Sequence, residues 1–247
     1  MKRMMKVKIH ATVIAVIALV VFTTVAFAAS YTLFGDAAIV SPGNASPHAV
    51  QIRSDAGPGF GGIRFDVPAG TTFADLDQLS TDFMPEADDL CTGGSPRFSI
   101  GIDTDGDGDR DGSIFVYFGP DSASAPCVPA VWQNTTDLLQ TGKLLDTSQL
   151  PGGTFYDPYD AALLKFGPMK VTSLTVVVDS SWAHPDGEQT FLIDNTNVDG
   201  TVYTYDQPQD KDECKNGGWM NLTQPDGTPF KNQGDCVSFV ASGGKAG

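Results

Sequence analysis

The sequence RFSIGIDTDGDGDRDGSIFVYF, residues 97–118, decides the fold class of this chain. Phe98, Ile100 and Ile102 alternate with polar or small residues, as one face of a half-buried β-strand does. Residues 114–118 are apolar throughout, which is typical of a strand in the centre of a sheet. The aspartate-rich and glycine-rich stretch between the two segments predicts the loop of a β-hairpin.

The rest of the chain is built from similar short β-prone runs that alternate with turn signals. Gly, Ser, Thr, Asp and Pro are plentiful, and these residues favour turns and strands over helices. Further strands are expected at residues 31–34, 37–40, 49–53, 62–67, 79–83, 131–134, 171–179, 190–193 and 201–205, with residues 138–145 as another candidate. Many short strands separated by turns predict an all-β fold, a jelly-roll-like β-sandwich.

One short helix is expected at residues 157–166, DPYDAALLKF. Asp157 stands at the N-cap position, and Pro158 stands at the first helical position, where its missing N–H costs nothing. Gly167 and Pro168 follow and are expected to end the helix.

The N-terminus has the three parts of a secretory signal peptide. Lys2, Arg3, Lys6 and Lys8 are basic, residues 11–25 are apolar, and the sequence Ala-Phe-Ala at residues 26–28 is a small-x-small cleavage site. The alternative is an uncleaved membrane anchor, but the apolar run is short for a membrane span. We expect residues 1–28 to be removed and the protein to be secreted, with no membrane insertion after cleavage.

The charge of the mature chain excludes some partners. Loss of residues 1–28 leaves 11 Lys and Arg against 30 Asp and Glu, a net charge of −19. Such a surface repels nucleic acids and anionic membranes, so neither is an expected partner. It suits a calcium-rich extracellular environment, in which bound cations offset part of the repulsion.

Four cysteines lie in the mature part, and an even number in an exported chain implies disulfides. Of the three connectivities, we expect Cys91–Cys127 and Cys214–Cys236, because each pair stays within one segment. Residues 29–205 would then form the sandwich, and residues 206–247 a linker and a small tail that needs its own disulfide.

The hairpin loop fits the pattern D-x-D-x-D-G-x-x-D, which lets alternating carboxylates reach one cation while Gly108 permits the turn. The candidate ligands are Asp103, Asp105, Asp107, Asp109 and Asp111, with Asp109 acting through its backbone carbonyl. Calcium is the expected ion. The twelfth position is Ile114 instead of a bidentate glutamate, and the flanks are strands, so we expect a structural ion and no calcium switch. A solvated acidic turn is the alternative. The Cys91–Cys127 bridge is expected to clamp the same edge of the sandwich.

Catalytic motifs are scarce in this sequence. His48 and His184 lie far apart, and neither a G-x-S-x-G elbow, nor H-E-x-x-H, nor a phosphate-binding loop is present. Candidate ligand-binding residues are aromatic side chains that could stack on a sugar, with nearby groups that bond hydroxyls. They are Trp132, Trp182, Tyr156, Tyr159, Asp194 and Asn195. For each aromatic residue, core packing is the alternative, and Asp194 and Asn195 could equally cap a turn.

Several stretches carry a resemblance to known proteins. GGIRFDVPAG (61–70), SPRFSIGIDTDGDGDRDG (95–112), LTVVVDSSW (174–182) and GEQTFLIDNTNVDG (187–200) resemble secreted bacterial proteins with a jelly-roll or galactose-binding-like β-sandwich. The tail, KDECKNGGWM (211–220) and PFKNQGDCVSFVAS (229–242), is similar to a short C-terminal motif found on many exported bacterial proteins. The second resemblance supports the Cys214–Cys236 pairing. Neither implies catalytic residues.

Three functions follow as hypotheses. The first is an exported, calcium-stabilised β-sandwich that binds an extracellular glycan without catalysis. The second is a structural surface or matrix protein with a purely structural calcium ion. The third is a polysaccharide hydrolase, which would use a pair of carboxyl groups in a cleft.

Overall fold

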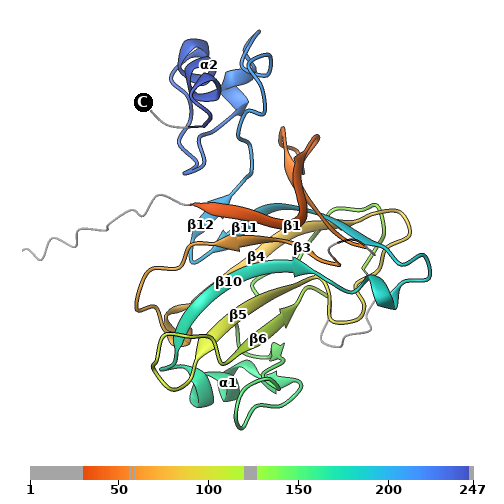
Figure 1. Cartoon of the computed structure of the whole chain (residues 1–247), viewed down its shortest axis with the longest axis vertical. Coiled ribbons are helices and arrows are strands. Elements are labelled where there is room, and N and C mark those ends of the chain that lie inside the picture. The colour runs from red at the N-terminus through yellow and green to blue at the C-terminus, as the bar shows by residue number, and fades with distance from the viewer. Residues whose placement is uncertain (1–29, 56, 58, 120–126, 245–247) are drawn as a thin grey trace, which may run out of the picture.

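The computed structural model describes residues 30–55, 57, 59–119 and 127–244 (Figure 1). The expected signal peptide lies outside these residues. The strands are β1 (Tyr31–Val40), β2 (Ala49–Ser54), β3 (Gly61–Phe65), β4 (Leu79–Pro85), β5 (Arg97–Asp103), β6 (Gly112–Tyr117), β7 (Gln133–Asn134), β8 (Leu144–Leu145), β9 (Asp157–Pro158), β10 (Lys170–Val178), β11 (Gln189–Val198) and β12 (Thr201–Tyr203). The helices are α1 (Tyr159–Phe166) and α2 (Gln233–Ala241). Neither of these helices is long and apolar enough to cross a membrane.

Ten strands form one curled antiparallel sheet in the order β6-β5-β10-β3-β1-β2-β11-β4-β7, with β12 paired to β11 (Figure 1). The curl folds the sheet over its own apolar face, which gives a sandwich-like, mostly β architecture. The all-β prediction is therefore confirmed.

Strand β1 belongs to both halves of the sheet. Residues 31–35 pair with β3, and residues 36–40 pair with β2. Gly35 forms the corner with a φ of +62°, and a Cβ there would lie 2.2 Å from the carbonyl oxygen of Phe60. Only glycine meets both conditions. The two separate strands expected at residues 31–34 and 37–40 are therefore one bent strand.

The core lies between the two halves of the curled sheet. Phe98, Ile100 and Ile102 of β5 are fully buried, as their alternation predicts. The ring of Phe118 lies 5.2 Å from that of Phe98 and 5.5 Å from that of Phe83 on β4, so aromatic contacts join the two halves. Burial of each such side chain contributes roughly 1.5–3 kcal/mol.

The segment around α1 differs from the prediction. Residues 138–145 do not extend the main sheet; β8 pairs with β9 in a separate two-stranded sheet. The helix begins at Tyr159, and Asp157 does not cap it. The buried Asp157 carboxylate instead accepts hydrogen bonds from the Lys165 ammonium, at 2.8 Å, and from the Thr147 hydroxyl. An ion pair within the segment thus replaces the expected cap.

Both expected disulfides are present, Cys91–Cys127 and Cys214–Cys236. The second lies inside a small core that is separate from that of the sandwich. The buried residues of this core are Cys214, Leu222, Phe230, Cys236 and Phe239.

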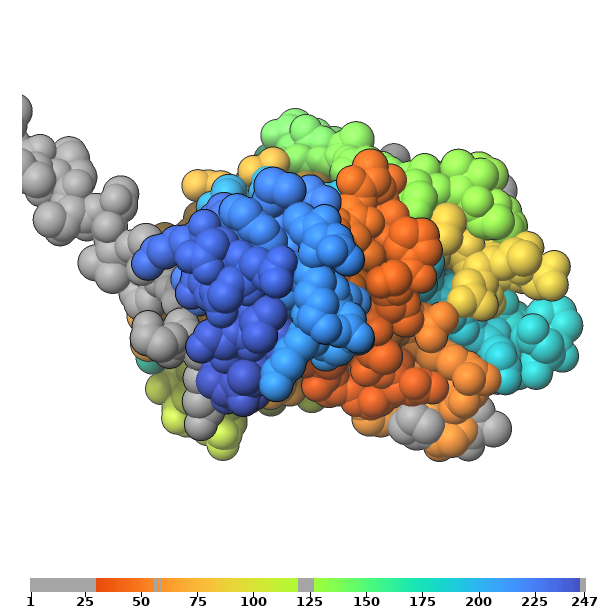
Figure 2. All heavy atoms as spheres, turned by 90° about the horizontal axis from the view of Figure 1, so that it is seen from above, coloured from red at the N-terminus to blue at the C-terminus, as the bar shows by residue number. Residues whose placement is uncertain are grey.

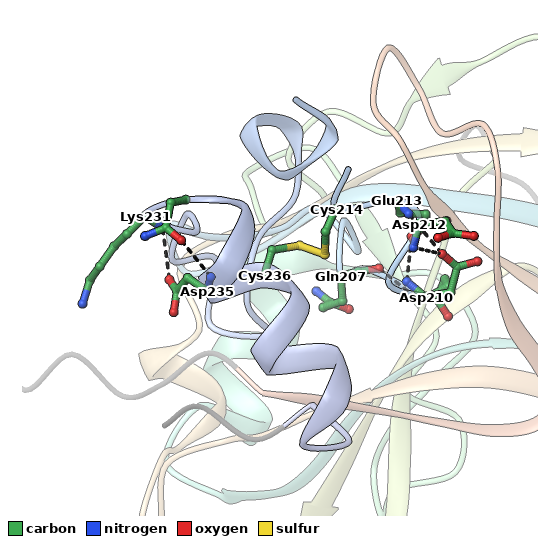
Figure 3. The surroundings of a disulfide bond; sticks show 10 residues. Gln207, Asp210, Asp212, Glu213, Cys214, Lys231, Asp235 and Cys236 are labelled. Carbon is green, nitrogen blue, oxygen red and sulfur yellow. Dashed lines mark hydrogen bonds between the residues drawn. A yellow bond between two sulfur atoms is a disulfide. The ribbon is translucent and has the colours of Figure 1, made fainter. Parts of the chain in front are cut away.

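The tail also contains α2, a helix that the sequence analysis did not predict. Asn232 is its N-cap, and the side chain accepts a hydrogen bond from the Asp235 N–H at 2.9 Å. The Asp235 carboxylate in turn accepts from the Lys231 N–H at 3.0 Å (Figure 3). These reciprocal bonds satisfy donors that a helix start leaves free.

The tail lies at the end of the sandwich opposite α1 (Figure 1) and beside the segment that joins β1 to β2 (Figure 2). The imidazole of His48 lies 3.1 Å from the Glu213 carboxylate, and the His48 N–H donates to the Asp206 carboxylate at 3.1 Å. The Tyr31 hydroxyl donates to the Gln207 side chain. These polar contacts connect the linker and tail to the sandwich.

Candidate functional site

The aspartate loop closes the β5–β6 hairpin and brings three carboxylates together. One carboxylate oxygen from each of Asp103, Asp105 and Asp111 lies within 4.8 Å of the others, a spacing that could hold a metal ion. The carboxylates of Asp107 and Asp109 are not part of this group. The cluster is thus smaller than the five residues of the motif.

Backbone donors orient the central carboxylate of this loop. Asp103 ends β5 and is buried, and its two oxygens accept hydrogen bonds from Gly106 N–H at 2.6 Å and Gly108 N–H at 3.0 Å. Asp111 accepts from the hydroxyl and N–H of Thr104, which lowers the pKa of this exposed carboxyl. Both groups are therefore held in a fixed direction, and Asp111 is ionised at neutral pH.

A cleft lies at the other end of the same hairpin. The sheet curls until β6, one edge strand, approaches β7 at the other edge. The lining comes from both edges and from the segment between them, and it includes Tyr117, Asn134, Lys143 and Tyr156. The volume of about 280 Å³ is close to the lower end of the roughly 300–1,000 Å³ of small-molecule pockets. The cleft could therefore hold a compact ligand.

Two polar side chains of the cleft wall, Gln133 and Tyr117, are fixed by internal hydrogen bonds. The Gln133 amide donates to the carbonyls of Val128 and Val131 and accepts from the Val128 N–H. The Tyr117 hydroxyl donates to the buried Asp146 carboxylate at 2.6 Å. Burial is the largest cause of the raised pKa of Tyr117, so its hydroxyl stays protonated. The wall is therefore formed before any ligand arrives.

Tyr156 is 40% exposed at the cleft, and the neighbouring Phe155 is 65% exposed. The two rings lie 6.3 Å apart and are tilted by 48°. An exposed aromatic face at the mouth of a cleft suits the apolar face of a sugar ring. Of the six expected ligand-binding residues, Tyr156 is the one that lines this cleft.

The other expected aromatic residues lie elsewhere. Tyr159 packs against the core, with its ring 6.4 Å from that of Phe73. Trp182 is 76% exposed, and it lies in a short 3-10 turn, Ser181–Ala183. Trp132 is half-buried next to β7. The structure does not bring these residues together into one binding surface.

Asp194 is fully buried, so a ligand does not reach it in this structure. Its carboxylate accepts hydrogen bonds from Asn44 N–H, Ser46 hydroxyl and Asn195 N–H, each at 2.7 Å. Asn195 follows in a left-handed conformation, where β11 has a bulge. Asp194 therefore holds the segment between β1 and β2 on the sheet.

Asp82 lies opposite Asp194 in the β4–β11 register. Its carboxylate accepts from the side-chain amides of Asn44, Asn134 and Asn195, at 2.7–2.8 Å. Asn134 also lines the cleft. We call Asp82 and these three asparagines the carboxamide cluster. Its hydrogen bonds hold Asn134, and with it one wall of the cleft, in place.

Asp194 is expected to make stability depend on pH. Burial raises the pKa of Asp194 to about 6. Because the folded-state value exceeds the unfolded-state value of about 3.9, this group adds stability below about pH 4 and the gain is lost as the pH rises through about 6. In urea unfolding, the contribution of Asp194 to the free energy of unfolding should be about 1 kcal/mol larger at pH 5 than at pH 7.

The variant Asp194→Asn isolates this effect, because the amide does not titrate. The free energy of unfolding at pH 5 minus that at pH 7 should be about 1 kcal/mol smaller in the variant than in the wild-type protein. The exposed Asp88→Asn is the matched control. An unchanged difference in Asp194→Asn would contradict the assignment.

The residues of the cleft lining other than Tyr156 were absent from the sequence-based candidates, and Tyr117 and Lys143 are two of them. Tyr117 is part of an apolar strand that looked like core, and Lys143 is an isolated cation in a turn. The period of two in a strand was the available signal for Tyr117, because it places Tyr117 on the same face as Phe115, and both are half-buried. The sequence carried no comparable signal for Lys143.

The Cys91–Cys127 bridge lies at the cleft end of the hairpin, where Cys127 contributes to the lining. Arg97 pairs with Tyr117 at this end, whereas Ile102 pairs with Gly112 beside the aspartate loop. Along a strand this separates the two ends by roughly 20 Å. The disulfide and the aspartate loop therefore lie at opposite ends of the hairpin.

Comparisons with known proteins assign no family to this chain. No known protein family and no curated protein matches it. A solved structure of the xyloglucanase domain of NopAA, a type three effector from Sinorhizobium fredii, in complex with cellobiose, is 15% identical with a TM-score of 0.28. The match covers 68% of this chain and 93% of that one. A TM-score of this size does not establish a shared fold.

Proposed function

We propose that this protein is an exported, calcium-stabilised β-sandwich that binds an extracellular carbohydrate in the cleft between β6 and β7. The observation that carries the proposal is the preformed cleft with the partly exposed Tyr156 in its lining. A tyrosine ring offers a flat apolar surface to a sugar, and the neighbouring amide and hydroxyl groups offer partners to sugar hydroxyls. The signal-peptide pattern and the two disulfides support export.

Calcium is the ion that suits the aspartate loop. Asp103, Asp105 and Asp111 supply hard oxygen donors, which calcium prefers, and Asp103 is already oriented by two backbone N–H groups. With no glutamate at Ile114, the affinity would lie on the order of 10⁻⁴ to 10⁻³ M. The role of the ion is to stabilise the hairpin.

Binding is favoured over hydrolysis by the chemistry of the cleft. Glycoside hydrolysis commonly uses two carboxyl groups on either side of the scissile bond. The described lining offers tyrosine, amide and ammonium groups. The Asp82 carboxylate is engaged by the side-chain amides of three asparagines, and the Asp194 carboxylate is fully buried. A purely structural role remains the alternative, and the following experiment decides between the two.

The variant Tyr156→Ala should lose carbohydrate binding. We expect the mature protein to bind at least one oligosaccharide on a glycan array with calcium, and the variant to bind it roughly tenfold more weakly, the loss of about 1.4 kcal/mol of stacking. Tyr156→Phe should retain most of the affinity, because it keeps the ring.

Trp182→Ala is the matched control, since it removes an exposed aromatic residue away from the cleft. A silent array would overturn the proposal and favour the structural role. Equal losses in Tyr156→Ala and Trp182→Ala would also contradict a site in the cleft.

A further inference from the structure

This inference rests on the proposed function. The positive charge of Lys143 in the cleft indicates which class of sugar the cleft would bind. Lys143 is half-buried and is the one charged side chain among the described residues that line the cleft. Among the interactions found in the described part of the chain, no ion pair or side-chain hydrogen bond involves its ammonium group. Within the part of the chain that the structure describes, the cleft therefore presents a cation without a counter-charge.

This arrangement contrasts with the rest of the molecule. The chain has 30 Asp and Glu against 15 Lys and Arg, so a cation is easily paired. Arg53, Arg97 and Lys165 each form an ion pair with a carboxylate. No aspartate or glutamate is among the described residues of the cleft lining. The Lys143 nitrogen is not among the buried polar atoms without a partner, so water reaches it. A ligand carboxylate would replace that water with a charge-assisted hydrogen bond.

The position of Lys143 is set by its backbone. Its N–H donates to the Gln140 carbonyl at 3.0 Å, and its carbonyl accepts from the Tyr159 N–H, the first residue of α1, at 2.9 Å. The stem of the side chain therefore starts from a fixed point in the wall that also carries Tyr156. A ligand can meet an aromatic face and a cation in the same cleft.

We propose that the cleft binds a uronic-acid residue of an acidic polysaccharide. The sugar carboxylate pairs with the Lys143 ammonium, while the apolar face of the sugar ring stacks on Tyr156. Neutral sugars can still stack on Tyr156, but they leave Lys143 without a counter-ion. The cleft therefore prefers the acidic form of a sugar over its neutral ester.

The test is a calorimetric titration of the mature protein at one fixed calcium concentration. The ligands are short oligomers of galacturonate, glucuronate and mannuronate, each compared with its methyl ester, which keeps the ring and removes the charge. We expect at least one acid to bind at least tenfold more tightly than its ester. Lys143→Gln should remove this difference, Lys143→Arg should retain it, and added salt should weaken binding of the acid alone.

Lys231→Gln is the matched control, because it removes the same charge from an exposed position on the tail (Figure 3). Equal affinity for acid and ester, with both weakened by Tyr156→Ala, would overturn the uronate preference and leave carbohydrate binding intact. Binding that Tyr156→Ala does not change would overturn the proposed function together with this inference, whereas no binding of any of these oligomers would overturn the uronate inference alone.

Discussion

Replacing Cys214 and Cys236 by serine is expected to unfold the tail while the sandwich stays folded. The disulfide spans 22 residues of sequence, and a bridge of this span contributes roughly 3 kcal/mol in the loop-entropy description. The tail buries only five residues in its own core, and so small a core rarely supplies more than about 3–5 kcal/mol. Loss of the bridge therefore removes most of the stability of the tail.

Hydrogen exchange measured by mass spectrometry would show this directly. Amides of α2 should exchange quickly in the double variant, whereas those of β5 and β10 should remain protected. The variant Cys91→Ser with Cys127→Ser is the matched control, because it should loosen the cleft end of the sandwich and leave α2 protected. Continued protection of α2 in the tail variant would show that its packing is sufficient without the bridge.

Removal of calcium is expected to have the second-largest effect. A free calcium concentration of 10 mM is about ten to one hundred times the expected dissociation constant, so binding to the folded state adds about 1.4–2.7 kcal/mol. For a chain of this size that corresponds to a melting temperature roughly 3–10 °C higher. Thermal unfolding of the mature protein with 10 mM calcium and with a chelator measures the difference.

The variant Asp105→Asn should weaken the response to calcium, because the side-chain amide keeps an oxygen donor but loses the negative charge. Asp105 is exposed, and an asparagine can still accept the hydrogen bond that the Asp107 N–H donates to it. Asp109→Asn is the matched control, because its carboxylate is not part of the cluster. A wild-type protein whose melting temperature ignores calcium, or an equal loss of response in both variants, would refute an ion at this cluster.

The strands were predictable where local pattern and burial agree. Phe98, Ile100 and Ile102 alternate in the sequence, and all three are fully buried. The bend of β1 was missed, because nothing around Gly35 marks a corner until the Phe60 carbonyl is seen against it. Asp157 was misread as a cap for a similar reason, since its partner Lys165 becomes visible only once the helix has formed.

The cleft could not be predicted, because its walls come from distant parts of the chain. Tyr117 ends β6, Asn134 belongs to β7 at the opposite edge, and Tyr156 precedes β9. Only the curl of the whole sheet brings these residues together. The aspartate loop is local in sequence, which is why its position was clear from the outset and only the number of converging carboxylates changed.

The separation of the aspartate loop from the cleft has a consequence for how the protein would behave outside the cell. An ion roughly 20 Å from the sugar acts on the folded state as a whole and leaves the sugar contacts alone. Ambient calcium would then set how long a molecule survives heat and proteases, while the polysaccharides nearby would set where it is retained. The stability of the protein and the place where it is retained would then be controlled at opposite ends of one hairpin.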